Sequence, residues 1–91
     1  MKIEFDPAKD AANIAKHGLS LADFDGFDGE ASVRADRRYA YGENRYRAFG
    51  RIDSRGFCIV YTRRGLTMRL ISFRRSHEKE MRRYEQGAPT A

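Results

Sequence analysis

The chain is 91 residues long, 41% hydrophobic and 34% charged, with a formal net charge of +5. A chain of this length and balance predicts one small domain, residues 1–91, and excludes a disordered protein, because its apolar content is sufficient for a core. No apolar stretch approaches the roughly 20 residues of a membrane span, the start lacks the apolar core of a signal peptide, and a single cysteine excludes an internal disulfide, so we expect a cytoplasmic protein.

The first thirty residues predict a strand followed by two helices. Residues 1–5 alternate between apolar and polar side chains, which is typical of a strand. Asp6 and the proline after it favour the start of a helix, and Gly18 favours its end. Four alanines at helical spacing predict an apolar stripe on this helix, namely Ala8, Ala11, Ala12 and Ala15. Ser20 is then expected to cap a second, short helix.

The remainder of the chain predicts four strands and a final helix. The strands are expected at residues 30–35, 44–51, 57–62 and 66–73, with the helix following Ser76 and ending before Gly87. Short turns between consecutive strands predict antiparallel pairing. We therefore expect an α+β fold with the order β-α-α-β-β-β-β-α, in which helices pack on a twisted antiparallel sheet. Residues 86–91 are expected to form a disordered tail.

Positive charge is concentrated in the later part of the chain. Residues 1–30 contain three Lys and seven Asp or Glu, whereas residues 31–91 contain fifteen Lys or Arg and six acids. All of these fifteen cations except Lys79 are arginines, whose planar guanidinium group binds phosphate through two hydrogen bonds. This asymmetry predicts a polyanionic partner, with nucleic acid first, and leaves a merely soluble basic surface as the alternative.

Arginines on the predicted strands and turns are the candidate phosphate-binding residues. Alternate residues of a strand share a face, so several guanidinium groups are expected to converge on one side of the sheet. The cluster comprises Arg45, Arg47, Arg51, Arg63, Arg64, Arg69, Arg74 and Arg75. Arg69 is the most informative, because it lies in an expected central strand on the face of Ile71 and Phe73. A buried charge needs a partner, so Arg69 either pairs with Glu80 or Glu43 or lies at the floor of an anion-binding groove.

Three further residues are candidates for proton transfer. His17 titrates near neutral pH, although the last turn of a helix is also where a histidine caps carbonyl groups. Glu43 either pairs with Arg45 or positions a reacting hydroxyl. Tyr84 is expected in the core, with a hydroxyl that faces the site as the alternative. No zinc, calcium or nucleotide-binding motif occurs in the sequence, so no metal and no cofactor are expected.

Several linked segments of the sequence resemble the signature of the BrnT toxins. In chain order they are residues 5–9, Asn13, residues 16–20, 42–46, 60–65 and 69–75, then Glu80 and residues 82–85. The resemblance covers about residues 3–86, and several motifs in a fixed order are more specific than any one alone. Two positions depart from the family pattern, since Phe5 stands in place of a tryptophan and Phe73 in place of a small residue.

The resemblance implies a RelE-like fold and an endoribonuclease toxin of a type II toxin–antitoxin system that inhibits translation. It also implies a BrnA-type antitoxin whose ribbon-helix-helix part binds operator DNA, so that the toxin meets DNA only through this partner. RNA is cleaved without a metal when the 2′-hydroxyl attacks the neighbouring phosphate. Such a reaction requires a positioned phosphate, stabilisation of negative charge and proton transfer.

The arginine cluster and the resemblance together assign roles to individual residues. Arg69 and Arg74 are expected to hold the scissile phosphate. His17 or Glu43 is expected to accept the proton of the 2′-hydroxyl, and Tyr84 to donate one to the leaving group. Further contacts to RNA are expected from Lys16, Arg45, Arg63, Arg64 and Arg75.

Two other functions are compatible with the same residues. A non-catalytic module that binds RNA or the ribosome would use the same arginines, with Tyr46 and Tyr61 stacking on bases. A DNA-binding regulator needs a helix that reads a groove of the duplex. Because the arginines lie mostly on predicted strands, we rank this last function lowest.

Overall fold

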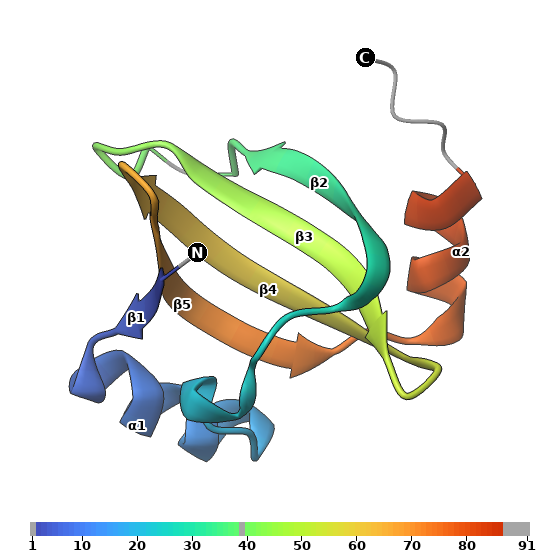
Figure 1. Ribbon diagram of the computed structural model, residues 1–91, viewed down its shortest axis with the longest axis horizontal. Helices are drawn as coiled ribbons and strands as arrows, with labels where there is room; N and C mark the ends of the chain where they lie inside the picture. The colour runs from blue at the N-terminus through green and yellow to red at the C-terminus, as the bar shows by residue number, and fades with distance from the viewer. Residues whose placement is uncertain (1, 39, 87–91) are drawn as a thin grey trace.

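The computed structural model describes residues 2–38 and 40–86, which form a curved sheet flanked by helices (Figure 1). The strands are β1 (Lys2–Phe5), β2 (Asp28–Asp36), β3 (Arg45–Ile52), β4 (Arg55–Arg64) and β5 (Thr67–Arg75). The helices are α1 (Pro7–His17) and α2 (Glu78–Gln86), with a 3-10 turn, η1 (Leu21–Asp23). The α+β prediction is thereby confirmed. Of the predicted tail, residue 86 belongs to α2, and residues 87–91 lie outside the described residues. In the described ranges no helix is long and apolar enough to span a membrane.

The strands form one mixed sheet in the order β1-β5-β4-β3-β2. The pairs β2–β3, β3–β4 and β4–β5 are antiparallel, as predicted. The prediction of a fully antiparallel sheet is wrong at β1, which runs parallel to β5 along its whole length. These two strands are far apart in the chain, so no turn fixes their relative direction and the alternation of side chains does not indicate it.

Two tight turns explain why the central strands pair antiparallel. Asp53 and Ser54 both have positive φ angles, 51° and 69°. This is the type I′ hairpin conformation, whose twist matches that of the flanking strands. Gly65, with φ of 60°, begins the turn that lets Arg64 pair with Thr67. Both are short turns between consecutive strands, as the sequence predicts, although the second lies at residues 65–66 and so includes Leu66, which was expected to begin the strand.

Two helix predictions need correction. The expected second helix is only the turn η1, in which Ser20 Oγ accepts a hydrogen bond from Ala22 N at 3.1 Å but the helical geometry ends after Asp23. The alanine stripe of α1 does not face the core, since Ala8, Ala11, Ala12 and Ala15 are all exposed. Alanine buries little apolar area, so polar contacts on another side of the helix decide how it docks.

Asn13 supplies those contacts. Its side chain is buried, with 5% of the residue exposed. Nδ2 donates to the carbonyl oxygens of Leu19 (2.8 Å) and Phe73 (2.9 Å), and Oδ1 accepts from Phe73 N (3.0 Å). β1 pairs with β5 only as far as Leu70. The Asn13 amide therefore takes over as the partner of the β5 backbone where β1 ends, and it fixes the last turns of α1 against the sheet.

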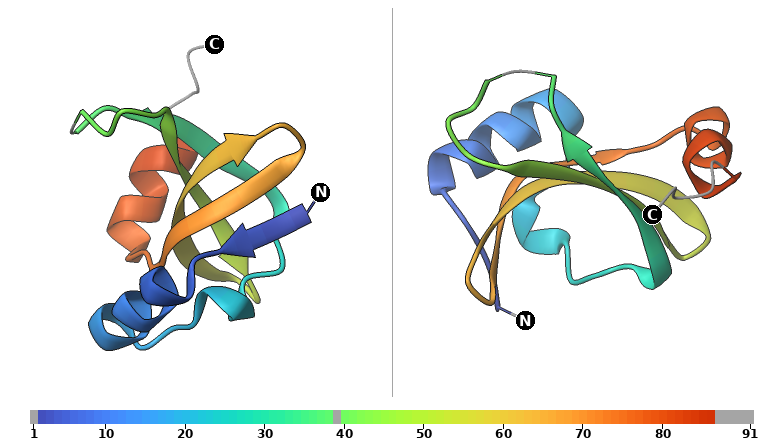
Figure 2. Two further views of the ribbon diagram at one scale, coloured as in Figure 1. Left: turned by 90° about the vertical axis from the view of Figure 1, so that its left-hand side faces the viewer. Right: turned by 90° about the horizontal axis from the view of Figure 1, so that it is seen from above.

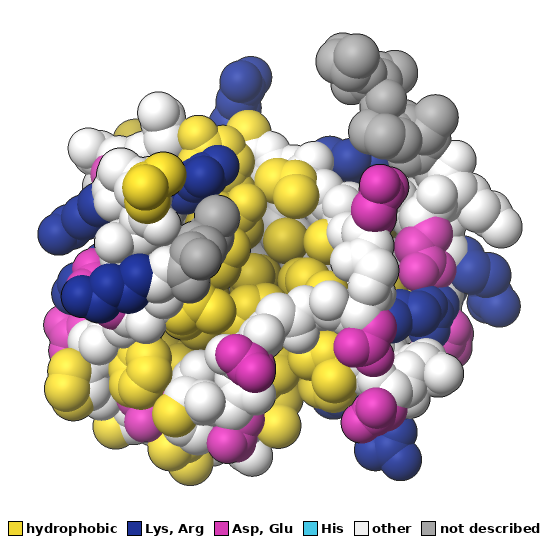
Figure 3. Space-filling view, viewed as in Figure 1, with side chains coloured by type: hydrophobic (Ala, Val, Ile, Leu, Met, Phe, Trp, Pro, Cys, Tyr) yellow, Lys and Arg dark blue, Asp and Glu magenta, His cyan; other side chains and the backbone are white. Residues whose placement is uncertain are grey.

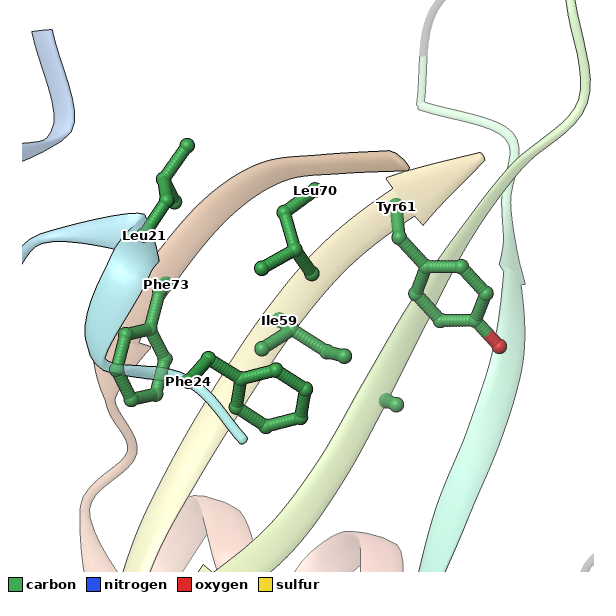
Figure 4. Close-up of a cluster of buried hydrophobic side chains, with 7 residues drawn as sticks. Leu21, Phe24, Ile59, Tyr61, Leu70 and Phe73 are labelled. Carbon is green, nitrogen blue, oxygen red and sulfur yellow. The ribbon is translucent and has the colours of Figure 1, made fainter. Parts of the chain in front are cut away.

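The main core lies on the face of the sheet that η1 and residues 24–27 cover. It consists of Leu21, Phe24, Ala48, Ile59, Tyr61, Leu70 and Phe73 (Figure 4). Phe24 packs edge-on against Phe73 with ring centroids 5.4 Å apart, and Gly50 leaves room for the ring of Phe27. Figure 3 shows this face, where part of the apolar surface remains open as a hollow of about 430 Å³.

α2 packs on the opposite face of the sheet. Phe49 and Cys58 contact Met81 there, and Tyr84 stacks on Phe49 with ring centroids 3.8 Å apart. A Cβ atom at Gly56 would collide with the side chain of Met81 and with the carbonyl oxygen of Ser76, so any larger residue here requires its neighbours to move. The right-hand view of Figure 2 shows α1 and η1 on opposite sides of the sheet. The face that carries α2 is therefore also the face on which α1 lies.

A bulge in β5 decides which arginines share a face. Ile71 is an extra residue in this strand, opposite a continuous stretch of β4. Leu70 and Phe73 consequently both reach the main core although they are three residues apart. Arg69 and Arg74, which each adjoin one of these core residues, both point to the other face. The prediction that Arg69 shares a face with Phe73 is wrong, because strict alternation does not survive the bulge.

Candidate active site

A groove of about 230 Å³ lies on the sheet face that α1 and α2 flank. Twelve of the described residues line it, namely Lys16, His17, Asp36, Arg38, Tyr41, Arg45, Arg47, Cys58, Val60, Ile71, Ser72 and Arg74. Five of these are Lys or Arg and only one is acidic, so we call this site the basic groove. A concave surface with such an excess of one charge concentrates counter-ions, and phosphate groups are the matching class of ligand.

The end of α1 brings Lys16 and His17 to the groove. Asp6 caps the start of this helix through a hydrogen bond from Ala8 N to Oδ1 (2.8 Å), and Gly18 ends it in the left-handed conformation. Burial lowers the pKa of His17, and the charges of Lys16 and Arg74 lower it further. Both effects favour the neutral imidazole of His17 near pH 7, which is the form that accepts a proton.

Arg74 is held at the groove by Glu80 of α2. Its two terminal nitrogens donate to the two carboxylate oxygens at 2.9 and 3.0 Å, and Ser76 Oγ donates to the same carboxylate at 2.6 Å. The hydrogen bonds from Arg74 lower the pKa of Glu80 to about 2. The pair is thus fully ionised near neutral pH, and the bidentate contact fixes the plane of the Arg74 guanidinium.

Asp36, Arg38 and Tyr41 form a second fixed unit along the groove. Arg38 donates through Nε and Nη2 to the two oxygens of Asp36, both at 2.8 Å, and the hydroxyl of Tyr41 donates to Asp36 Oδ2 at 3.1 Å. The hydrogen bonds from Arg38 hold the pKa of Asp36 well below its usual range. Sequence reasoning missed all three residues, because the segment reads only as a polar loop. The sequence offered one indication of this unit, namely an acidic and a basic residue two positions apart at Asp36 and Arg38, which pair in the structure.

A small cavity of about 80 Å³ adjoins the groove, because Arg45 and Ile71 line both. Glu43, Arg64 and Arg69 line this cavity but not the groove itself. Arg45 Nε donates to Glu43 at 3.1 Å, which confirms one of the two expectations for Glu43. The guanidinium carbon of Arg45 lies 4.1 Å from the ring centroid of Tyr41. Arg69 pairs with Glu4 of the parallel strand at 3.2 Å, rather than with Glu80 or Glu43.

Three residues that the sequence assigned to the site lie elsewhere. Tyr84 stacks on Phe49 beneath α2 and does not line the groove. Arg75 lies over the ring of Phe57, 5.1 Å from its centroid, and so extends on the main-core side of the sheet. Arg63 is exposed and alternates onto the same side as Tyr61. These positions give the three side chains no direct access to the basic groove.

Cys58 lines the groove although the sequence did not suggest it, and Arg47 lines it although the sequence placed it only in the arginine cluster and gave it no individual role. The alternation of β3 indicated that Arg45 and Arg47 share a face, which is confirmed, yet nothing local distinguished the second arginine. Arg47 Nε is buried and has no hydrogen-bond acceptor in the described part of the chain, at a typical cost of about 1–3 kcal/mol. Burial raises the pKa of the Cys58 thiol to about 11, so this group stays protonated and is not a ready nucleophile.

The described residues contain no group of three or more His, Cys, Asp or Glu side chains that could hold a metal ion. What the groove offers is a neutral imidazole beside several guanidinium groups and one ammonium group. This combination can bind a phosphodiester, stabilise additional negative charge on it and accept one proton.

Comparison with known proteins identifies the family. No curated protein sequence matches the chain. A family model for the BrnT ribonuclease toxins of type II toxin–antitoxin systems matches residues 5–80, a range that contains all twelve residues of the basic groove. The chain therefore belongs to the BrnT ribonuclease toxins of type II toxin–antitoxin systems.

Proposed function

We propose that this chain is a metal-independent endoribonuclease toxin that inhibits translation and that its active site is the basic groove. The observation that carries the proposal is the presence of His17, whose lowered pKa favours the neutral form, in the same groove as Arg74 and Lys16. Membership of a ribonuclease toxin family supplies the class of substrate. A neutral base beside fixed cations is what cleavage by the RNA's own 2′-hydroxyl requires.

His17 accepts the proton of the 2′-hydroxyl in this mechanism. The freed oxygen attacks the adjacent phosphorus in line with the bond to the 5′ oxygen, and that bond breaks as the leaving oxygen takes up a proton from solvent water. The products are a 2′,3′-cyclic phosphate and a 5′-hydroxyl end. Arginine does not serve as the base, because it stays protonated. Glu43 is the weaker candidate for the base, since it is paired with Arg45.

The cations of the groove stabilise the extra charge of the transition state. Arg74 is the best oriented of them, because Glu80 fixes its guanidinium before substrate binds. Arg45, Arg64 and Arg69, around the small adjoining cavity, are placed to contact flanking phosphates. Tyr84 has no evident role in this mechanism, and its stacking on Phe49 supports a structural one.

The family implies an antitoxin partner. We take this partner to be of the BrnA type, with a ribbon-helix-helix part that binds operator DNA, and we expect the toxin to act in the cytoplasm. The RelE-like assignment of the fold is part of the same proposal. The mixed sheet and its two flanking helices are the features that support it.

Induced expression in a bacterial host tests the proposed function. Growth and total RNA integrity are followed for the parent chain, for a double substitution in the groove (Lys16→Ala, His17→Ala) and for a matched double substitution outside it (Arg63→Ala, Arg75→Ala). We expect arrest with fragmented RNA for the parent and the outer variant, and normal growth for the groove variant. Arrest with intact RNA would favour a non-catalytic inhibitor that binds RNA or the ribosome. Fragmentation by the folded groove variant would refute the assignment of the site.

A further inference from the structure

The cations of the basic groove differ in whether the protein already neutralises them. Three of its four arginines are held in ion pairs, namely Arg38 with Asp36, Arg45 with Glu43 and Arg74 with Glu80. A phosphate that approaches any of these three must compete with a carboxylate for the same guanidinium nitrogens. These three paired arginines are therefore better suited to orienting a substrate that is already bound than to binding it first.

Arg47 is the exception among these arginines. It lies near the middle of β3, opposite Val60 of β4, and both residues line the groove. It has no carboxylate partner in the described part of the chain, and its buried Nε meets no acceptor there. Its guanidinium carbon lies 5.8 Å from the ring centroids of both Phe49 and Tyr84. These two rings orient the side chain without neutralising its charge.

The charge of Arg47 acts inside the groove. It is close enough to Cys58 to lower the pKa of that thiol against the larger effect of burial, and Arg74 acts on the same thiol in the same direction. Arg47, Cys58 and Arg74 all line the groove, and Cys58 is the register partner of Arg74. The neighbouring position on β2 is also an arginine, Arg34, which adds positive potential from the adjacent strand. A partly buried charge without a counter-charge is costly, so an anion from outside the protein would be stabilised beside Arg47.

We propose that Arg47 is the primary phosphate-binding residue of the basic groove. Its terminal guanidinium nitrogens bind a phosphate of the RNA backbone before the other arginines do. Arg74 is then the group that orients the bound phosphate toward His17. The inference rests on the proposed ribonuclease function for the identity of the anion. It assigns a role to a residue that neither the sequence motifs nor the mechanism above required.

The test measures binding separately from cleavage, on a short RNA that carries 2′-O-methyl groups and therefore has no nucleophile. Arg47→Met removes the charge but keeps a stem that packs on Phe49 and Tyr84, and Arg47→Lys keeps the charge without the planar fork. Arg63→Met is the matched control, because it removes one cation from the next strand outside the groove. Each purified full-length variant is first checked by circular dichroism and thermal unfolding.

We expect Arg47→Met to weaken binding of the methylated RNA by about 10- to 100-fold, as loss of a charge-assisted contact does. The slope of log affinity against log salt should fall by about 0.7, which corresponds to one phosphate of a single strand. Arg47→Lys should be intermediate, and Arg63→Met should stay close to the parent. Equal binding by Arg47→Met and Arg63→Met would overturn the proposal.

A second measurement keeps the proposal testable if Arg47→Met does not fold. In the parent protein labelled with 15N-arginine, the Nε–H resonance of Arg47 should move as the methylated RNA is added, while that of Arg63, outside the groove, should stay in place. An Arg47 resonance that does not move would refute the assignment. If the parent binds through Arg47 but cleaves no unmodified RNA, the proposed catalytic function fails and the binding assignment stands.

Discussion

Replacement of Asn13 is the most informative test of how the fold builds the site. This one side chain joins α1 to the sheet through hydrogen bonds to Leu19 and Phe73, and His17 follows it by about one helical turn. Asn13→Ala removes the two donated hydrogen bonds and the accepted one. The amide of Phe73 and two carbonyl oxygens are then left without partners in a buried place.

The expected loss follows from those contacts. Each buried hydrogen bond contributes about 0.5–1.5 kcal/mol net, so Asn13→Ala should lower the free energy of unfolding by about 2–4 kcal/mol. A small domain has only about 5–15 kcal/mol in total. At about 4–8 °C for each kcal/mol, the melting temperature should fall by about 10 °C or more. His17 should also regain a more ordinary pKa as α1 loosens, because its burial and its proximity to Arg74 lower that pKa in the parent.

Urea and thermal unfolding, followed by circular dichroism, measure this loss. Asn13→Asp is the companion variant: it keeps the acceptor but turns a carboxylate toward two carbonyl oxygens, which raises the pKa of the new carboxyl group in the folded state. It should be the less stable of the two near neutral pH and recover as the pH falls, when the group becomes a donor. The exposed Asn44 provides the control substitution, Asn44→Ala. An Asn13→Ala variant within about 0.5 kcal/mol of the parent, the range of ordinary surface substitutions, would refute the reasoning.

Three further predictions concern the groove and its support. The pKa of Glu80 is lowered from 4.5 to about 2, so the stability that its pairing with Arg74 contributes should be complete above about pH 4.5 and lost as the pH falls toward 2. The unfolding free energies of the parent and of Glu80→Gln should therefore converge on acidification. A difference between them that stays constant with pH would contradict this prediction. The pKa of His17 lies below 6.5, so the cleavage rate of the parent should decline only below that pH. His17→Asn should lower the rate by about 10²- to 10⁴-fold and abolish this decline at acidic pH. A pH–rate profile that the substitution leaves unchanged would rule out His17 as the base. Gly56→Ala places a methyl group against Met81 and 2.8 Å from the carbonyl oxygen of Ser76. Urea unfolding should therefore show that the free energy of unfolding falls by about 1–3 kcal/mol. Unchanged stability would mean that α2 shifts freely to make room.

Much of the strand arrangement was predictable because local signals agree with each other. The alternation of residues 44–51 placed Arg45 and Arg47 on one face, and the short turn expected after them predicted the antiparallel pairing of β3 with β4. The cap at Asp6 and the end at Gly18 also fall where the sequence predicts them. In each case the preference of a few adjacent residues coincides with what the whole fold requires.

The errors arose where distant parts of the chain decide the outcome. The parallel pairing of β1 with β5, and with it the ion pair between Glu4 and Arg69, joins opposite ends of the sequence. The bulge at Ile71 inserts a residue that no periodicity reveals. The alanines of α1 suggested an apolar contact, whereas the helix docks through Asn13.

The class of ligand of the candidate site was predictable from the sequence, but the full set of residues that form the site was not. The excess of arginine indicated a polyanionic ligand, and His17, Lys16, Arg45 and Arg74 do line one groove. Which arginines are paired was not predictable, because each pairing depends on carboxylates brought near by tertiary structure. The unpaired state of Arg47, on which the further inference depends, became visible only in the folded chain.

Analysis of the RNA ends produced by the purified chain tests the central claim most directly. The chain is incubated in the presence of EDTA with an end-labelled RNA and, in parallel, with the same RNA carrying 2′-O-methyl groups. We expect cleavage of the unmodified RNA alone, with 2′,3′-cyclic phosphate and 5′-hydroxyl ends, since the 2′-hydroxyl is the nucleophile and His17 the base. Products with 3′-hydroxyl and 5′-phosphate ends, cleavage of the methylated RNA, or activity that appears only when a divalent metal is added would contradict this account.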